Sequence, residues 1–231
     1  MARIIIAGDS WGCGEWDFDP IETGHIITHK GIEQYFLDDG YAVVNLCKGG
    51  ASNNFAINSL RNYPNITDGD IILWFQTDPL RDLQPYDGFH EEFTNYDTII
   101  TAQEKLLEQT YTNLDSIGYK IICIGGCSKL RIRPQNPYYN LIPILASFAE
   151  FAFVEYVHPE VWFSDWYYLV DRQFDLDSLD KLLYNKELQD QLRLPKNQNW
   201  VSPDGQHPNR IAHRKLYEFL LSHETIFKRT T

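Results

Sequence analysis

The chain has 231 residues, of which 43% are hydrophobic and 23% charged, and its formal net charge is −12 at pH 7. This composition is ordinary for a soluble globular protein, and the acidic balance argues against nucleic acid or an anionic membrane surface as a partner. No apolar run approaches the roughly 20 residues that span a bilayer, and no basic leader with an apolar segment is seen at the start. We therefore expect a soluble, cytoplasmic protein without a membrane span, with residues 1–231 forming a single domain.

The first elements predicted in chain order surround a short polar triplet. Residues 3–7 form an Ile-rich run, typical of a buried strand, that stops before Gly8-Asp9-Ser10. Residues 12–24 show no clear period and are interpreted as a loop. A helix is expected over residues 29–37, because the turn signal Asp38-Asp39-Gly40 follows it.

Strand-like and helical segments then alternate along the chain. Further strands are predicted over residues 41–46, 70–76 and 119–126, with a weaker candidate over 153–157. Helices are predicted from an N-cap at Ser52 or Asn53 to residue 63, and over residues 97–116, 179–192 and 210–222. This alternation indicates βαβ units, hence a parallel sheet with helices on both faces. Residues 128–200, rich in proline, aromatic and acidic residues, are interpreted as an elaboration over the active end of the sheet.

Metal and cofactor chemistry finds no support in the sequence. The four cysteines, Cys13, Cys47, Cys123 and Cys127, form no CxxC pair and no zinc spacing, so we expect reduced structural thiols. His25 and His29 lack the glutamate of an HExxH motif, and the glycines that follow the first strand fit neither GxGxxG nor GxxxxGK[ST]. We therefore expect no metal and no cofactor.

Three residues at opposite ends of the chain predict nucleophilic catalysis. Ser10 follows the first strand, at the sheet edge where open α/β folds bind ligands. Asp204 and His207 lie three residues apart before a helix, so the carboxylate can hold the imidazole while the imidazole accepts a proton from serine. Together they predict a Ser-His-Asp triad.

The same residues lie in motifs that resemble those of the SGNH (GDSL-type) hydrolases. Gly8-Asp9-Ser10 resembles the first block of that family, Asn45 through Gly50-Ala51-Ser52-Asn53 its second, and Asp204-Gly205-Gln206-His207-Pro208 its last. The resemblance implies a three-layer α/β/α sandwich with a parallel, flavodoxin-like sheet. It also implies a serine esterase in which Ser10 is the nucleophile and Gly50 donates a backbone N–H to the oxyanion. Small esters or acyl groups on carbohydrates are the implied substrates.

One block departs from the family pattern. The family has Gly-x-Asn-Asp after the third strand, where this chain has Phe75-Gln76-Thr77-Asp78. The expected oxyanion donors are therefore the N–H groups of Ser10 and Gly50 together with a polar group of Gln76 or Thr77. Loss of one such donor typically costs about 10²–10³ in kcat.

Alternatives to this interpretation remain open in the sequence. Ser10 could cap a helix and Asp204 could be a turn residue before Gly205. Glu155 and His158 have the same spacing as Asp204 and His207, but they lie in a strand-like run that would separate their side chains. A catalytically weak or inactive relative that binds a glycan or a protein, and a structural subunit of an assembly, are the competing functions.

Overall fold

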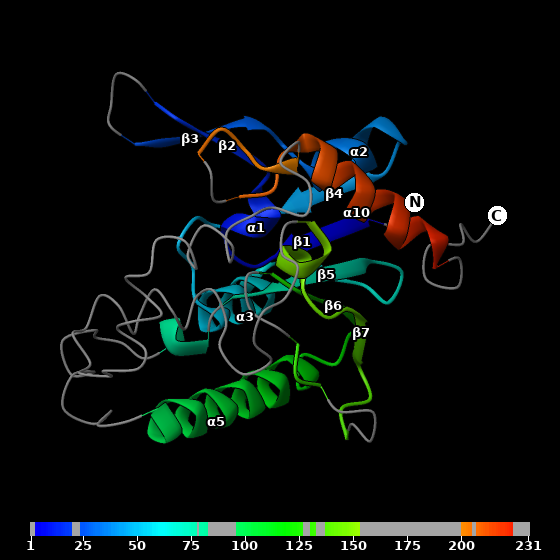
Figure 1. Cartoon of the computed structure of the whole chain (residues 1–231). Coiled ribbons are helices and arrows are strands. Elements are labelled where there is room, and N and C mark those ends of the chain that lie inside the picture. The colour runs from blue at the N-terminus through cyan, green and yellow to red at the C-terminus, as the bar shows by residue number, and fades with distance from the viewer. Residues whose placement is uncertain are drawn as a thin grey trace.

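The computed structural model describes residues 3–19, 24–77, 79–82, 96–126, 130–132, 137–152, 200–204 and 207–223. Its centre is a five-stranded parallel sheet in the order β4-β1-β5-β6-β7 (Figure 1). The strands are β1 (Arg3–Ala7), β4 (Ala42–Asn45), β5 (Ile71–Gln76), β6 (Ile121–Gly125) and β7 (Leu141–Leu145). This is the flavodoxin-like order, with the first strand between the second and third of the sheet.

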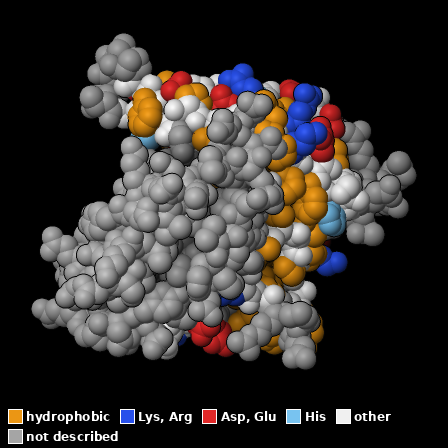
Figure 2. Space-filling view, viewed as in Figure 1, with side chains coloured by type: hydrophobic (Ala, Val, Ile, Leu, Met, Phe, Trp, Pro, Cys, Tyr) orange, Lys and Arg blue, Asp and Glu red, His pale blue; other side chains and the backbone are white. Residues whose placement is uncertain are grey.

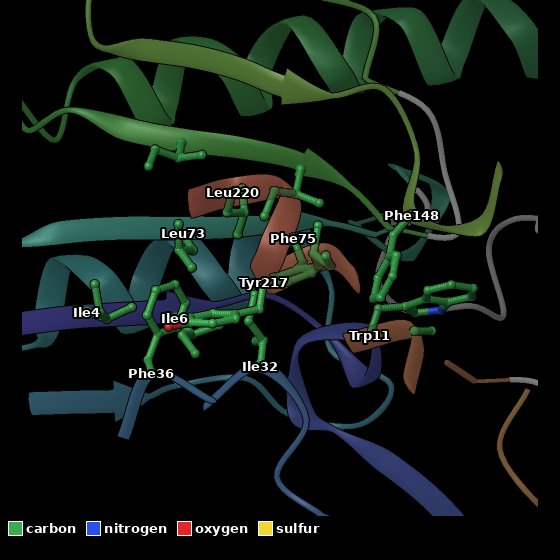
Figure 3. Packing of buried hydrophobic residues seen from close by; sticks show 14 of the residues in the cluster. Ile4, Ile6, Trp11, Ile32, Phe36, Leu73, Phe75, Phe148, Tyr217 and Leu220 are labelled. Carbon is green, nitrogen blue, oxygen red and sulfur yellow. The ribbon is translucent and has the colours of Figure 1, made fainter. Parts of the chain in front are cut away.

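Helices cover both faces of the sheet. The longer helices are α2 (Ile32–Asp38), α3 (Asn53–Asn62), α5 (Tyr96–Asp115) and α10 (Arg210–Ser222), and the short ones are α1 (Ser10–Cys13), η1 (Pro79–Asp82) and α6 (Phe148–Ala152). Alternate strand residues point to opposite faces, so Ile6 and Phe75 pack with α2 and α10 (Figure 3), whereas Ile5 and Trp74 pack with α3 and α5. The result is a three-layer α/β/α sandwich, as the sequence predicts.

Most predicted elements are confirmed with small shifts in their ends. The terminal helix has the predicted bounds, and Ser52 is the N-cap of α3, where its side chain accepts a hydrogen bond from the Phe55 N–H. The predicted strand 153–157, the predicted helix 179–192 and the alternative pair Glu155/His158 lie outside the described residues.

The loop predicted over residues 12–24 is wrong at residues 12–13, which belong to α1, and at residues 15–18, whereas residues 20–23 lie outside the described residues. After α1 the chain forms β2 (Glu15–Phe18), which pairs antiparallel with β3 (His25–His29) in a separate two-stranded sheet. The alternation of polar and aromatic residues in Glu15-Trp16-Asp17-Phe18 is that of a half-buried strand, but four residues are too few to stand out. This hairpin projects from the body of the molecule at the upper left of Figure 1.

The fifth strand of the sheet also differs from the prediction. It is β7, which contains Pro143 and pairs with β6 at one edge of the sheet. Proline lacks an N–H and is tolerated at an edge strand, where one side of the backbone needs no ladder partner. A proline within a short apolar run argues against a strand, so the sequence does not predict β7.

The carboxyl ends of the three neighbouring strands β4, β1 and β5 bring their following loops together. Gly8 follows β1 with φ +147°, and a Cβ there would lie 2.6 Å from the Phe75 carbonyl oxygen. Glycine is therefore required where the serine loop leaves the sheet beside β5. The loop before α10 completes the same edge, as the contacts of His207 below show.

Candidate active site

The structure brings Ser10, His207 and Asp204 into one hydrogen-bonded row. The Ser10 Oγ lies 2.8 Å from Nε2 of His207, and Nδ1 of the same ring lies 2.5 Å from Oδ2 of Asp204. Ser10 and Asp204 are almost fully buried, and the His207 side chain is 15% exposed. The imidazole thus has one nitrogen on the hydroxyl and the other on the carboxylate, which is the arrangement that a charge-stabilised general base needs.

The loop that carries His207 is fixed by its own backbone. Val201 and Pro208 form an isolated antiparallel bridge, and the Ser202 N–H donates to the His207 carbonyl at 2.8 Å. The His207 N–H donates to Oδ1 of Asp204 at 3.1 Å, so the carboxylate holds both the ring and the backbone of the same residue. Asn209 then caps α10 by accepting from the first N–H groups of the helix. The short spacing of Asp204 and His207 is therefore built into a closed turn.

An ion pair ties this loop to the serine side of the site. Glu15, at the start of β2, accepts hydrogen bonds from the backbone N–H of Arg210 at 2.6 Å and from its Nε and Nη2 at 2.9 and 2.8 Å. The Glu15 side chain is 7% exposed, and its hydrogen bonds to Arg210 hold the pKa of its carboxyl below the usual value. The bidentate guanidinium thus joins the first turn of α10 to the first residue of β2, two positions after the end of the serine helix.

Trp16 contacts three parts of the site at once. Its Nε1–H donates to the Ser10 carbonyl at 2.9 Å, and its ring centroid lies 5.3 Å from that of His207. A Cβ added to Gly49 would meet the Trp16 ring at 3.0 Å, so the glycine allows the loop after β4 to approach the ring. The indole therefore lies between the serine, the histidine and the Gly49-Gly50 loop. Trp16 has no part in the site predicted from the sequence, because its segment, residues 12–24, shows no clear period.

Thr77 occupies the position of the expected oxyanion donor, but its hydroxyl donates elsewhere. Thr77 Oγ1 lies 2.6 Å from Oδ2 of Asp9, and it accepts from Nη1 of Arg81 at 3.0 Å. Arg81 also donates to Asp9 at 3.2 Å. Burial raises the pKa of Asp9, while Arg81 and Thr77 oppose the rise. Because a hydroxyl has a single proton, Thr77 supports the buried carboxylate and leaves no donor for an oxyanion.

Gln76 points to the other side of the sheet. Its Oε1 accepts a hydrogen bond of 2.7 Å from the hydroxyl of Tyr111 on α5, whereas the preceding residue, Phe75, packs on the α10 side. The alternation of a strand explains this orientation. The two polar side chains expected at the end of β5 are thus both engaged in structural hydrogen bonds.

The backbone at the end of β5 is held by Asn53. Its Oδ1 accepts from the Thr77 N–H at 3.0 Å, and its Nδ2 donates to the Thr77 carbonyl at 3.2 Å. The side-chain amide pairs with Thr77 as a neighbouring strand would, which fixes the loop after β5 to the start of α3. The sequence offered Asn53 only as a possible helix cap.

Gly50 lies in the loop after β4, with φ +69°, and its N–H makes no hydrogen bond within the described ranges. A positive φ favours glycine because it has no Cβ. The assignment of this N–H and that of Ser10 to an oxyanion, which the family resemblance implies, stays a prediction.

Within the described part of the chain, no group of three or more His, Cys, Asp or Glu side chains is placed to hold a metal ion. Cys13, Cys47 and Cys123 are free thiols there, and burial raises the pKa of Cys47 well above its usual value. Of the helices described, none has the length and apolar character to cross a membrane.

Comparison with known proteins gives structural likenesses only. No protein-family model matches the chain, and no curated protein matches it. A lipase/acylhydrolase from Enterococcus faecalis is similar over 100% of both chains, with 14% identity and a TM-score of 0.41. A putative arylesterase from Agrobacterium tumefaciens matches 98% of this chain and 100% of its own, with 14% identity and a TM-score of 0.41. A carbohydrate esterase structure matches 98% of this chain and 65% of its own, with 11% identity and a TM-score of 0.46.

These solved structures are named as a lipase/acylhydrolase, a putative arylesterase and a carbohydrate esterase. At such low identity the likeness concerns the fold alone, and no residue role is taken from it.

Proposed function

We propose that this protein is a serine ester hydrolase with Ser10 as nucleophile, His207 as general base and Asp204 as the residue that orients the imidazole. The observation that carries the proposal is the row of two contacts, Oγ to Nε2 at 2.8 Å and Nδ1 to the Asp204 carboxylate at 2.5 Å. A buried serine that only capped its helix would need no imidazole, and here Asp9 already supplies the cap of α1. These contacts favour the nucleophile over the capping role.

The reaction follows from this geometry. Ser10 Oγ attacks the ester carbonyl carbon while Nε2 of His207 takes the hydroxyl proton, and the carbonyl oxygen becomes an oxyanion. His207 then gives the proton to the alcohol oxygen as the C–O bond breaks, leaving an acyl group on Ser10. Water, deprotonated by His207, releases the acid and restores the serine. Asp204 stabilises the imidazolium throughout without itself gaining a proton.

The oxyanion is assigned to the backbone N–H groups of Ser10 and Gly50. The side chain of Thr77 is not included because its hydroxyl donates to Asp9, and that of Gln76 is not included because it points to the α5 face of the sheet, where it accepts from Tyr111. Small esters and acylated carbohydrates are the proposed substrate classes, and the net charge of −12 favours neutral substrates over anionic ones.

Covalent labelling tests the proposal directly. The purified protein is treated with a fluorophosphonate and the modified residue is located by mass spectrometry. We expect label on Ser10 and a loss of ester hydrolysis of at least about 10³-fold in Ser10→Ala and His207→Ala. Ser222, an exposed serine that ends α10, gives the matched control Ser222→Ala, which keeps both label and activity. Label elsewhere, or full activity in Ser10→Ala, would refute the assignment.

A second candidate, a binding module with little turnover, is favoured by one observation. The Thr77 hydroxyl is committed to Asp9, so the site has one side-chain oxyanion donor fewer than the family pattern. Binding of acetylated glycans by calorimetry, with turnover no faster than in the His207→Ala variant, would favour this candidate over the enzyme.

A further inference from the structure

The hairpin beside the candidate site has one face that is largely apolar and open to solvent. We define the hairpin face by four residues, Trp16, Phe18, His25 and Ile27. In the antiparallel pairing Trp16 lies opposite Ile27 and Phe18 opposite His25, and directly paired residues share a face of the sheet. Phe18 is 54% and Ile27 46% exposed, and hydrophobic side chains show on the projecting hairpin at the upper left of Figure 2. Such exposure next to a candidate site indicates a ligand surface.

This face begins at the proposed catalytic residues. The Trp16 ring lies 5.3 Å from that of His207, and the ring of His25 has its Nδ1 3.8 Å from Oδ2 of Asp204. From there the face continues outward, since the Phe18 ring centroid lies 4.9 Å from that of His25. The apolar surface is thus continuous with the histidine side of the candidate site.

The chemistry of ester cleavage decides which part of a substrate meets this face. His207 delivers its proton to the alcohol oxygen, so that oxygen must come within hydrogen-bond reach of Nε2. Among the residues that the structure describes, two tryptophan rings lie near the His207 ring. Trp11, at 6.1 Å, belongs to the buried core with Phe148 (Figure 3), whereas Trp16 lies on the side that leads to solvent. A group attached to the alcohol oxygen therefore leaves the site along Trp16.

The side chains on the face select an apolar, uncharged group. The Nε1–H of Trp16 is already donated to the Ser10 carbonyl, and neither Phe18 nor Ile27 has a polar side-chain atom. The fourth residue, His25, has polar ring nitrogens, of which Nδ1 lies 3.8 Å from the Asp204 carboxylate. The surrounding carboxylates, with Asp204 at the inner end and Asp17 on the opposite face of β2, disfavour an anionic group. We infer that the hairpin face is the subsite for the alcohol part of the ester, and that this part is an apolar alkyl or aryl group. This inference rests on the proposed function and narrows its two substrate classes to one, small esters of apolar alcohols, in place of acylated carbohydrates.

The length of the face sets a chain-length preference. Trp16 and Phe18 are two residues apart on a strand, about 7 Å, which an alkyl chain of about five carbons covers. Each fully buried methylene contributes ~0.8 kcal/mol, a factor of about four, and a one-sided surface gives about half of that energy, a factor of about two. Among acetate esters of n-alkyl alcohols, kcat/KM is expected to rise about twofold per methylene from ethyl to hexyl and then to level off.

Two isoleucines of the hairpin provide a matched pair of variants. Ile27 lies on the hairpin face, whereas Ile26 pairs with Asp17 and lies on the opposite face, and the two are 46% and 42% exposed. In Ile27→Ser and Phe18→Ser the ratio of kcat/KM for hexyl acetate to that for ethyl acetate should fall from about 16-fold to below about fourfold. Ile26→Ser should keep the wild-type ratio. Thermal melting checks that all three variants are folded.

Two further substrate series separate this subsite from other uses of the face. Ethyl esters of acids from acetate to hexanoate vary the acyl chain alone, and the three hairpin variants should leave their ratios unchanged. An O-acetylated methyl xyloside tests a sugar as the alcohol part. The inference is overturned if Ile26→Ser and Ile27→Ser change the hexyl-to-ethyl ratio of kcat/KM equally, or if the variants change the ratios of the acyl series and not those of the alcohol series. It is also overturned if Ile27→Ser and Phe18→Ser lower kcat/KM for the xyloside acetate more than for hexyl acetate.

Failure of the inference is distinct from failure of the proposed function. Steady hydrolysis of ethyl acetate that depends on Ser10, without any preference for longer alcohols, overturns the subsite and keeps the esterase. No hydrolysis of any ester, and no label on Ser10, overturns both.

Discussion

Glu15 and Arg210 are 195 positions apart in the sequence, and their side chains form a bidentate ion pair that also includes the Arg210 backbone N–H. The pair links the first residue of β2, which follows the serine helix after Gly14, to the first residue of α10, which follows the His207 turn. It therefore holds the two halves of the candidate site at a fixed separation.

Removing the guanidinium should both destabilise the protein and slow the reaction. In Arg210→Met the nearly buried Glu15 loses two side-chain partners, so the free energy of unfolding should fall by about 1–3 kcal/mol. Because His207 shifts relative to Ser10, kcat should fall more than KM rises. Urea unfolding and steady-state kinetics measure the two effects. Lys215→Met is the control, since Lys215 pairs with Glu218 on the exposed surface, and it should change stability by less than about 0.5 kcal/mol.

Trp16→Phe tests the indole N–H. The substitution keeps an aromatic ring near His207 but removes the hydrogen bond to the Ser10 carbonyl. Loss of one such bond costs about 1 kcal/mol, so kcat/KM for a short ester should fall about fivefold. Trp200→Phe, in which a tryptophan packed on Phe151 is replaced, should show no such fall. Equal effects of the two substitutions would assign Trp16 a purely structural role.

Thr77→Val tests the support of the buried Asp9. Valine has the shape of threonine without the hydroxyl, so Asp9 loses a donor at 2.6 Å and keeps Arg81 and the Trp11 N–H. The stability should fall by about 1–3 kcal/mol, and the pKa of Asp9 should rise further because a group that favours its charged form is gone. If the hydroxyl instead served the oxyanion, kcat would fall about 10²-fold with little loss of stability. Denaturant unfolding together with kinetics separates the two roles.

His213 predicts how stability depends on pH. This residue of α10 is fully buried beside Phe148, at a ring distance of 5.3 Å, and burial lowers its pKa from 6.5 to about 3. Between these pH values the unfolded chain binds a proton on His213 that the folded chain does not bind. The contribution of neutral His213 to the free energy of unfolding is therefore fully present above pH 6.5 and is lost as the pH falls toward 3.

The expected slope from His213 is about 1.4 kcal/mol per pH unit between pH 6 and about 3. In His213→Leu, which cannot titrate, the fall in stability between pH 7 and 5 should be smaller than in the wild type by up to about 2 kcal/mol. Urea unfolding at several pH values measures the free energy of unfolding of both proteins. The same pH dependence in His213→Leu and in the wild type would contradict a neutral buried His213. His223→Leu, at the C-cap of the same helix, serves as the control.

The predicted fold came from apolar runs, and these were enough wherever burial alone decides the structure. Strands such as β1 and β5 are buried on both faces, so their continuous Ile and Leu residues mark them. β2 has no such run because it is half exposed, and in β7 Pro143 interrupts the apolar run. Their identity depends on pairing with distant partners, which a local pattern does not contain.

The candidate site divides in a similar way. Ser10, His207 and Asp204 follow from residue types and positions, and the structure places them together. The direction of the Gln76 and Thr77 side chains depends on which face of the sheet each residue points to. It also depends on their partners, Tyr111 for Gln76 and Asp9 and Arg81 for Thr77, and a short motif does not contain this information. Trp16 contacts His207 and Arg210 contacts Glu15, in both cases across more than 190 positions of the sequence, so no local sequence pattern predicts these contacts.

The hydrogen bond between Ser10 and His207 spans 197 positions. During synthesis the serine leaves the ribosome early, and the histidine follows only after nearly all the residues described here have been made. A growing chain that stops short of residue 207 holds a hydroxyl without its base, and the entropy of closing so long a loop must be met by the packing of α10. The order of translation therefore delays the row of hydrogen bonds between Ser10, His207 and Asp204 until most of the sandwich around it has been synthesised.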